Sequence, residues 1–196
     1  MVTAGRPREF DEAVALERAM LLFWRKGYRN TSLSDLTAEM AMNRPSIYAA
    51  FGDKSSLFQR TLGSYIDKYA AKSIARLDSS DDLGEAIGGF LKQAAEIFTH
   101  QELPGGCMVA CHLSDNELDQ DTRAILQELS ERWIRTLSAR IERAIAEGQL
   151  DASQSPLGVA SLVVCILSGM SQAARNGASY AQLEGTITAF MNVLKR

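Results

Sequence analysis

Cysteine, proline and strand-like patterns are all scarce in this sequence. It has three cysteines and four prolines in 196 residues. An odd and low number of cysteines argues against a disulfide framework. Each proline fits the first turn of a helix or the loop before one, and no run alternates apolar and polar residues as a half-buried strand would. These absences exclude a disulfide-stapled or β-rich fold and favour an all-α one.

Nothing near the N-terminus resembles a signal peptide, because residues 1–12 are polar and basic and contain no apolar core. We therefore expect a cytoplasmic protein. One stretch, between Asp151 and Arg175, has no charged residue and is long enough to cross a bilayer. Its serine and glutamine residues favour instead a helix that is packed by other helices, so we expect no membrane association.

An excess of basic residues is also missing, since the net charge is −3. The charges are unevenly placed, however. Residues 1–62 carry nine Lys or Arg against seven Asp or Glu, a net charge of +2, whereas residues 63–196 carry twelve against seventeen, a net charge of −5. A weakly basic head on an acidic body lets only one end of the molecule approach phosphate groups.

What the chain does contain is helical periodicity along nearly its whole length, with apolar residues every three or four positions. We expect an all-α fold of about nine helices, which span residues 10–26, 33–40, 43–51, 54–76, 81–100, 107–113, 119–147, 155–176 and 179–195. They divide into a three-helix head, residues 1–65, and a helical body, residues 66–196.

Two short helices carry start signals that place them in a helix-turn-helix. Ser32 with Asp35 three residues later forms a capping-box pattern, and Asn43 followed by Pro45 marks the start of the next helix. Only residues 41–42 separate the two helices, a spacing typical of this motif. In a helix-turn-helix the second helix lies in the major groove of DNA, and its first residues reach base edges.

The residues at the start of that second helix suit DNA recognition. Arg44 offers two donors to a guanine, Ser46 suits a base or a phosphate, and Tyr48 reaches a phosphate unless it packs on the first helix. Leu36 and Phe51 are expected in the core of the head. The full set of expected DNA contacts is Thr31, Ser32, Asn43, Arg44, Pro45, Ser46, Tyr48, Ala49, Lys54 and, in the N-terminal arm, Arg6 and Arg8.

These motifs resemble those of a known family. Residues 23–28 (FWRKGY), 31–36 (TSLSDL) and 43–54 (NRPSIYAAFGDK) are similar to the DNA-binding head of TetR-family regulators. The resemblance implies a homodimer whose heads occupy the two halves of a palindromic double-stranded operator, and phosphate contacts from the positions of Tyr48 and Lys54. Ala41 departs from the family, which usually has glycine in the turn. The turn therefore either avoids a left-handed conformation or carries strain.

Cys107, Cys111 and His112 leave several interpretations open. The two cysteines share a helix face and with His112 could hold a soft metal. Cys107 at a helix start also suits reaction with an electrophile, because a helix N-terminus lowers the pKa of a thiol. Buried cysteine behaves as a small hydrophobe, and a fourth zinc ligand is not obvious. We favour packing here, with no metal and no cofactor, and expect Cys165 to pack as well.

The body offers candidates for an effector pocket and for a dimer interface. Large apolar and sulfur-containing side chains either line a pocket or fill the core; they are Phe90, Phe98, Cys107, Met108, Cys111, Trp133 and Met170. The uncharged helix carries small residues near one face, such as Gly158, Cys165 and Gly169, so another helix can approach it closely. With the last helix it would form half of a four-helix dimer interface; the alternative is burial within one subunit.

These observations predict a ligand-responsive DNA-binding repressor that is not an enzyme. An unknown small-molecule effector in the body would favour another arrangement of the long helix from Lys54, and so shift the population away from DNA. Two alternatives stay open. One is an enzyme that uses Cys107, Cys111 and His112, for which no base–nucleophile pair with an orienting group is visible. The other is a helical interaction module whose head no longer binds DNA.

Overall fold

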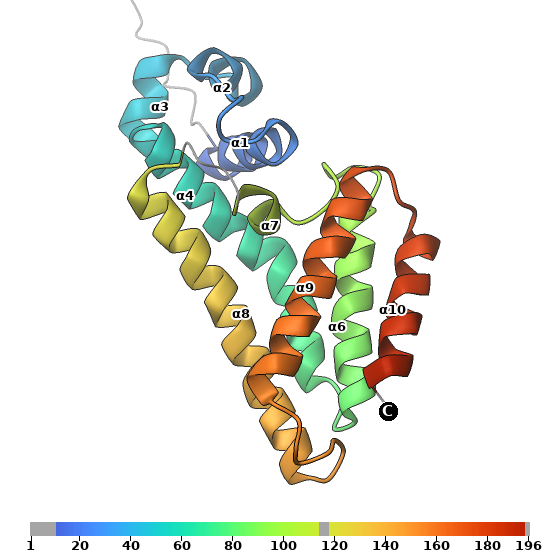
Figure 1. The fold of residues 1–196 in the computed structure, drawn as a ribbon. Coiled ribbons are helices and arrows are strands. Elements are labelled where there is room, and N and C mark those ends of the chain that lie inside the picture. Colours follow the sequence, from blue (N-terminus) through green and yellow to red (C-terminus); the bar gives the residue numbers. More distant parts are fainter. Residues whose placement is uncertain (1–10, 114–117, 195–196) are drawn as a thin grey trace, which may run out of the picture.

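The computed structural model describes residues 11–113 and 118–194, and all regular structure within these ranges is helical (Figure 1). With the continuous rod 54–78 counted as one helix, the described part of the chain has nine helices, which confirms the predicted all-α class. Their bounds are α1 (Glu12–Lys26), α2 (Leu33–Met40), α3 (Arg44–Phe51), α4 (Lys54–Tyr65) with η1 (Ile66–Ala70), α5 (Ala71–Ile74) and η2 (Ala75–Asp78), then α6 (Leu83–Phe98), α7 (Met108–His112), α8 (Gln120–Ala146), α9 (Pro156–Arg175) and α10 (Tyr180–Leu194).

The head helices α1, α2 and α3 pack around a small aromatic core. Phe58 of α4 lies in it, with ring centroids 5.1 Å from Phe23 and 5.0 Å from Tyr28. Leu36 and Phe51 are buried, as predicted. Burial of one such side chain contributes about 1.5–3 kcal/mol. Packing of this kind stabilises helices of eight residues, which are too short to form alone in water.

A single helical rod, residues 54–78, connects the head to the body (Figure 1). It begins as α4, passes through the π-helical turn η1 and ends as the 3-10 turn η2. A π turn closes each backbone hydrogen bond over one residue more than an α-helix does. At the far end the buried guanidinium of Arg140 donates to the carbonyl oxygens of Leu77, Ser80 and Asp81 at 2.7–3.2 Å. Arg140 therefore anchors the end of the rod to α8.

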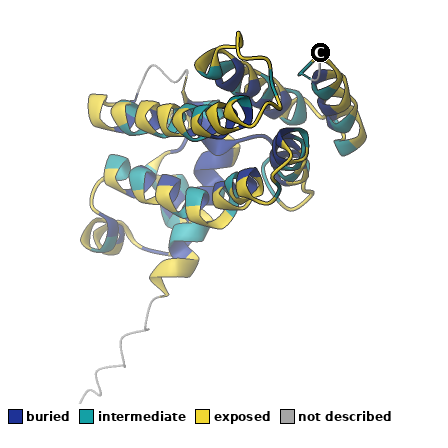
Figure 2. Ribbon diagram, turned by 90° about the horizontal axis from the view of Figure 1, so that it is seen from below, coloured by how far each residue is buried: buried dark blue, intermediate teal, exposed yellow. Residues whose placement is uncertain are grey.

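The remaining long helices form the body. α8 packs along α9, and α6 packs against the rod, α9 and α10. Buried residues line the inner faces of these helices, while exposed residues follow their outer faces (Figure 2). α9 is 20 residues long and contains an 18-residue window with a mean hydropathy of 1.8, and it is the one helix in the described ranges that could cross a membrane by length and composition alone. Core helices of soluble proteins meet the same criterion.

Candidate nucleic-acid interface and body cavity

The two helices of the helix-turn-helix are capped as the sequence predicts. The Ser32 hydroxyl accepts the amide of Asp35 at 3.1 Å, and the Asp35 carboxylate accepts the amide of Ser32 at 2.8 Å. A hydrogen-bonded ion pair with Lys26 at 2.9 Å, together with the Ser32 bonds, lowers the pKa of Asp35 below its usual range. Asn43 caps α3 by accepting the amide of Ser46 at 2.9 Å. These caps fix where α2 and α3 begin.

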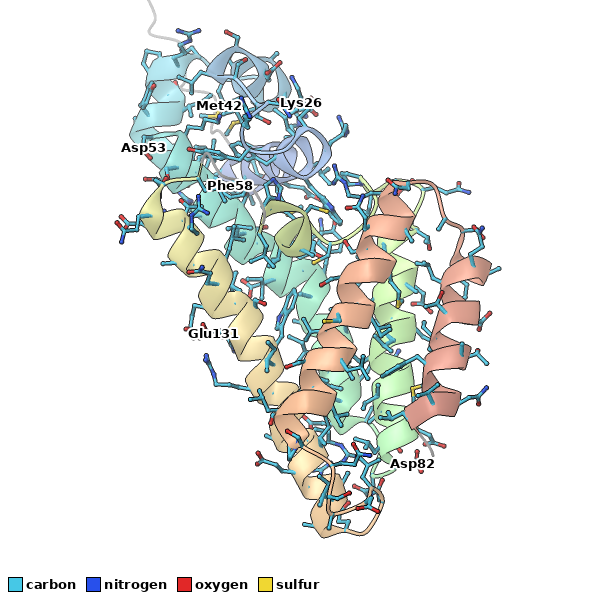
Figure 3. The ribbon with its side chains drawn as sticks, in the orientation of Figure 1. Lys26, Met42, Asp53, Phe58, Asp82 and Glu131 are labelled. Carbon is cyan, nitrogen blue, oxygen red and sulfur yellow. The ribbon has the colours of Figure 1, made fainter. Side chains whose placement is uncertain are left out.

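The turn between α2 and α3 is left-handed at Ala41, with φ 54° and ψ 39°. The Ala41 amide donates to the carbonyl of Ala38, and the Met42 amide donates to that of Thr37 at 3.1 Å. This pair of bonds is the Schellman arrangement, in which glycine is the usual left-handed residue. Of the two alternatives at Ala41, the structure therefore shows the strained one. Met42 closes the motif by burying its side chain against the head (Figure 3).

One face of α3 is buried and the other is free to meet a ligand. Ile47 and Phe51 are buried in the head. The predicted DNA-contact residues of this helix lie on the other side and are all exposed: Asn43, Arg44, Pro45, Ser46, Tyr48 and Ala49. Tyr48 is 48% exposed, so it is not buried against α1 and about half of its surface faces solvent. The exposed set is short, polar and centred on one arginine, as a helix that inserts into a groove requires.

Two cationic side chains of α4, Lys54 and Arg60, contact the head next to the exposed face of α3. Lys54, at the start of α4, has its Nζ 4.2 Å from the centroid of the Tyr28 ring, a cation–π contact that keeps the cation beside the head. Arg60 donates to the carbonyl oxygen of Ala50 at 2.7 Å and lies 4.6 Å from the Phe51 ring. Because that carbonyl has no helical partner, Arg60 acts as a cap at the C-terminal end of α3.

Thr31 is a correction to the predicted site. Its side chain is completely buried, and its hydroxyl donates to the carbonyl oxygen of Gly27 at 2.7 Å. Its amide donates to the carbonyl of Tyr28, so a phosphate contact from Thr31 is wrong. Ser32 is exposed and stays a prediction. Arg6 and Arg8 lie outside the described residues.

A residue that the sequence did not single out also lies on this face. Ser34, in the first turn of α2, accepts a hydrogen bond from Nη2 of Arg44 at 3.0 Å. The two residues are ten apart and belong to different helices. No local periodicity could have paired them, because their contact depends on how α2 crosses α3.

The head is fixed to the body by contacts around Trp24, a buried residue of α1. Its indole Nε1 donates to the carbonyl oxygen of Gly105 at 3.1 Å, and its own carbonyl accepts from Arg175 of α9 at 3.0 Å. On the adjacent side, the ring of Phe58 in α4 contacts that of His112 in α7 in a tilted arrangement, with centroids 5.0 Å apart and 54° between the ring planes. The loop before α7 thus touches the head and α9 at once.

Gly106 allows that loop to approach α9 closely. Its φ is +68°, and a Cβ there would lie 2.7 Å from the carbonyl oxygen of Ser171 and 2.8 Å from Cγ of Arg175. The next amide, that of Cys107, donates to the Ser171 hydroxyl at 2.7 Å. Glycine is required here by both the backbone conformation and the lack of space.

Beside this junction the body contains a small cavity of about 20 Å³, roughly the space for one water molecule. Its lining comes from the rod, α6, α8, α9 and Cys107, and all eleven residues are uncharged: Tyr65, Ala70, Ser73, Ile74, Phe90, Ala94, Ile97, Phe98, Cys107, Trp133 and Leu167. Four of the predicted pocket residues are among them, Phe90, Phe98, Cys107 and Trp133. Met108 and Met170 are buried outside this lining, and Cys111 is half-buried outside it.

Cys107 is placed as predicted at the N-cap of α7, but its thiol is not activated. Burial raises the pKa of the Cys107 thiol, and the Tyr65 hydroxyl donates to its sulfur at 3.4 Å. Burial likewise raises the pKa of Tyr65 well above its usual value. The expectation that the helix start lowers this thiol's pKa is therefore wrong, because removal from water outweighs a five-residue helix. No cluster of metal-ligating side chains occurs within the described residues.

The outer faces of α9 and α10 expose several apolar side chains. Leu157 and Leu162 are 60% and 45% exposed, and Val193 of α10 is 67% exposed. Cys165, which was expected to pack, is exposed in the single chain and lies on this face of α9, so its packing stays a prediction that depends on a partner helix. Within the chain α9 packs through its opposite face, which carries Val159, Val163, Leu167 and Met170.

An exposed polar helix on a capped helix-turn-helix, joined by one rod to a helical body, defines a DNA-binding transcription regulator with a separate regulatory body. Comparison with known proteins then identifies the family. Residues 15–61 match "Bacterial regulatory proteins, tetR family", and residues 85–190 match "Tetracyclin repressor-like, C-terminal domain". The chain belongs to the TetR family, and this membership decides against the enzyme alternative.

Similar proteins cover nearly the whole chain. The HTH-type transcriptional repressor ComR of Escherichia coli K12 is 36% identical over 183 residues, which are 91% of this chain and 86% of ComR. BdcR of the same organism, also an HTH-type transcriptional repressor, is 31% identical over 93% of this chain and 88% of its own. A cysteine mutant of the TetR-family regulator CifR, solved in complex with 26 bp double-strand operator DNA, has a TM-score of 0.90 at 31% identity and covers 97% of this chain and 100% of that one.

Proposed function

We propose that this protein is a dimeric repressor that binds a palindromic double-stranded operator through α3 and is released from it by a small molecule bound in the body. The exposed N-terminal face of α3 carries this proposal, because Arg44, Ser46 and Tyr48 project from a fixed helix and have no role in the core. The similarity to CifR in its complex with operator DNA supports the same conclusion. A cytoplasmic location fits a regulator of this family.

The homodimer is supported by the outer face of α9 and α10. Leu157, Leu162 and Val193 are too exposed to stabilise a single chain, and exposed apolar patches of this kind mark association sites. Two such pairs of helices related by a two-fold axis would make a four-helix interface. The same axis would set the spacing between the two heads on DNA.

Oligomeric state tests the interface directly. Leu162→Arg places a charge on the outer face of α9, and we expect it to give a monomer in analytical ultracentrifugation. Val14→Arg is the matched control, because Val14 on α1 is also 45% exposed and lies outside this face. Dimers from both variants would refute the interface.

Release by an effector is supported by the position of the cavity. Tyr65 and Ala70 of the rod line it, and Cys107 connects it to the loop that holds Trp24. Since the cavity has space for about one water molecule, a larger molecule can enter only if the walls move. A ligand that binds better to the widened body would shift the rod, and with it the head, away from the DNA-binding arrangement.

Sequence-specific DNA binding is tested by selecting an operator from random-sequence duplex DNA at near-physiological salt. We expect a palindromic consensus with half-sites about one helical turn apart. Arg44→Ala should lose affinity for that consensus while its circular dichroism spectrum stays helical. Absence of enrichment from folded, dimeric protein, before and after extensive dialysis to remove effectors, would refute the proposal.

A further inference from the structure

The guanidinium of Arg44 is held by a neighbouring helix before any DNA is bound. Its Nη2 donates to Oγ of Ser34 at 3.0 Å. Arg44 is the first residue of α3 and Ser34 the second of α2, and both side chains are exposed. The backbone of Ser34 is fixed in the first turn of α2, where its carbonyl oxygen also accepts the hydroxyl of Thr37 at 2.8 Å.

The chemistry of this bond leaves Arg44 free to read a base. A guanidinium has five N–H donors in one plane, and Ser34 occupies one of them. A guanine needs two, for its O6 and N7 atoms. Because the group is planar and tethered by its own side chain, a bond at one edge narrows the directions in which the remaining donors can point.

We propose that Ser34 is a positioning residue for sequence recognition, which orients Arg44 toward a guanine in the major groove. The inference rests on the proposed function, in which Arg44 reads a base. Ser34 sets the preference at the base pair that Arg44 contacts, while the phosphate contacts of the head set most of the affinity.

Loss of the Ser34 hydroxyl should therefore change discrimination more than overall binding. Without it Arg44 samples other rotamers, from which it also reaches phosphate groups. A well-placed bidentate arginine–guanine pair contributes roughly 5- to 150-fold of discrimination against a wrong base. Because the bond to Ser34 is exposed to water, we expect Ser34→Ala to lose about three- to tenfold of that preference at one base pair.

The test uses the full-length dimer, the selected operator and a set of operators that each change one base pair symmetrically in both half-sites. Fluorescence anisotropy at fixed salt gives the affinity of each operator for the wild type, Arg44→Ala, Ser34→Ala, Ser34→Thr and the double variant Ser34→Ala/Arg44→Ala. Ser64→Ala is the matched control, since Ser64 lies in the second half of α4. A thermal melt of each variant checks its fold.

We expect Arg44→Ala to abolish discrimination at one base pair, Ser34→Ala to reduce it at the same pair, Ser34→Thr to restore it, and the double variant to match Arg44→Ala. If Arg44→Ala weakens all operators equally, Arg44 does not read a base and the proposed role of α3 is wrong. If Arg44→Ala behaves as expected but Ser34→Ala weakens all operators equally, only the positioning role is overturned. An additional loss in the double variant would show that Ser34 acts on DNA independently and would also overturn it.

Discussion

Replacing Ala41 by glycine is expected to stabilise the protein, although glycine usually destabilises helical proteins. Ala41 is exposed and has φ 54° and ψ 39°, so its backbone is left-handed. An L-residue costs about 1–2 kcal/mol in this region, and glycine avoids that cost. Glycine loses about 0.4–1 kcal/mol more conformational entropy on folding. The difference favours Ala41→Gly by roughly 0.5–1 kcal/mol, or a Tm increase of about 1–4 °C for a chain of this length.

Urea unfolding followed by circular dichroism, at one fixed protein concentration, measures this change; the concentration matters because a dimer's apparent stability depends on it. Ala38→Gly is the matched control. Ala38 is exposed and lies three residues earlier within α2, where the same substitution should cost about 0.5–1 kcal/mol. The reasoning is refuted if both variants are destabilised equally, because the backbone at Ala41 would then carry no strain.

Three further predictions concern the junction and the caps. Gly106→Ala should lower the free energy of unfolding by about 2–4 kcal/mol, because alanine is strained in a left-handed backbone and its Cβ would clash with α9. Gly177→Ala is the control: its φ is +93° but nothing lies within 4 Å of the added Cβ, so the same urea titration should show a loss of only about 1–2 kcal/mol. Trp24→Phe removes the bond to the Gly105 carbonyl and leaves space where a fully buried indole was packed, so it should cost about 1–3 kcal/mol, with hydrogen exchange faster in the loop before α7. Unchanged exchange there would contradict the junction. The pKa of Asp35 is depressed in the folded head, so its contribution to stability is present above its ordinary pKa and is lost as the pH falls below that value. Asp35→Asn should remove this acid-dependent part of the stability, and pH–stability curves that stay parallel between about pH 5 and pH 2 would show that the cap is not responsible.

The helices and caps of the head were predictable because their signals are local. Ser32 with Asp35, and Asn43 with Pro45, each fix a helix start through atoms a few residues apart. Each of these bonds joins atoms within a few residues of one another, so its signal lies inside a short window of sequence even though packing stabilises the helix that it caps. The polar face of α3 followed from the same starting points.

The errors all concern which side of an element faces the protein interior. Thr31 was assigned from its position at the start of a helix, but its burial, like the exposure of Cys165 in the single chain, depends on how whole helices pack. Cys107 was placed correctly at a helix start, yet burial decides its pKa. The contact between Ser34 and Arg44 depends on the crossing of two helices. None of these is encoded in a window of neighbouring residues.

Because of the π turn η1, we expect the protein to tolerate the removal of one residue from the rod better than the insertion of one. Tyr65 and Tyr69, on either side of the start of this turn, both contact Trp24, with centroids 4.9 Å and 5.6 Å away. Lys68 in the same turn forms an ion pair with Glu17 of α1. The turn holds one residue more than an α-helix needs, so removing one residue could convert it to an α-helix without rotating the head relative to the cavity. An inserted residue cannot be absorbed in this way and would rotate the head relative to the body. A single-residue insertion in the rod should therefore disrupt the contacts between head and body far more than a deletion.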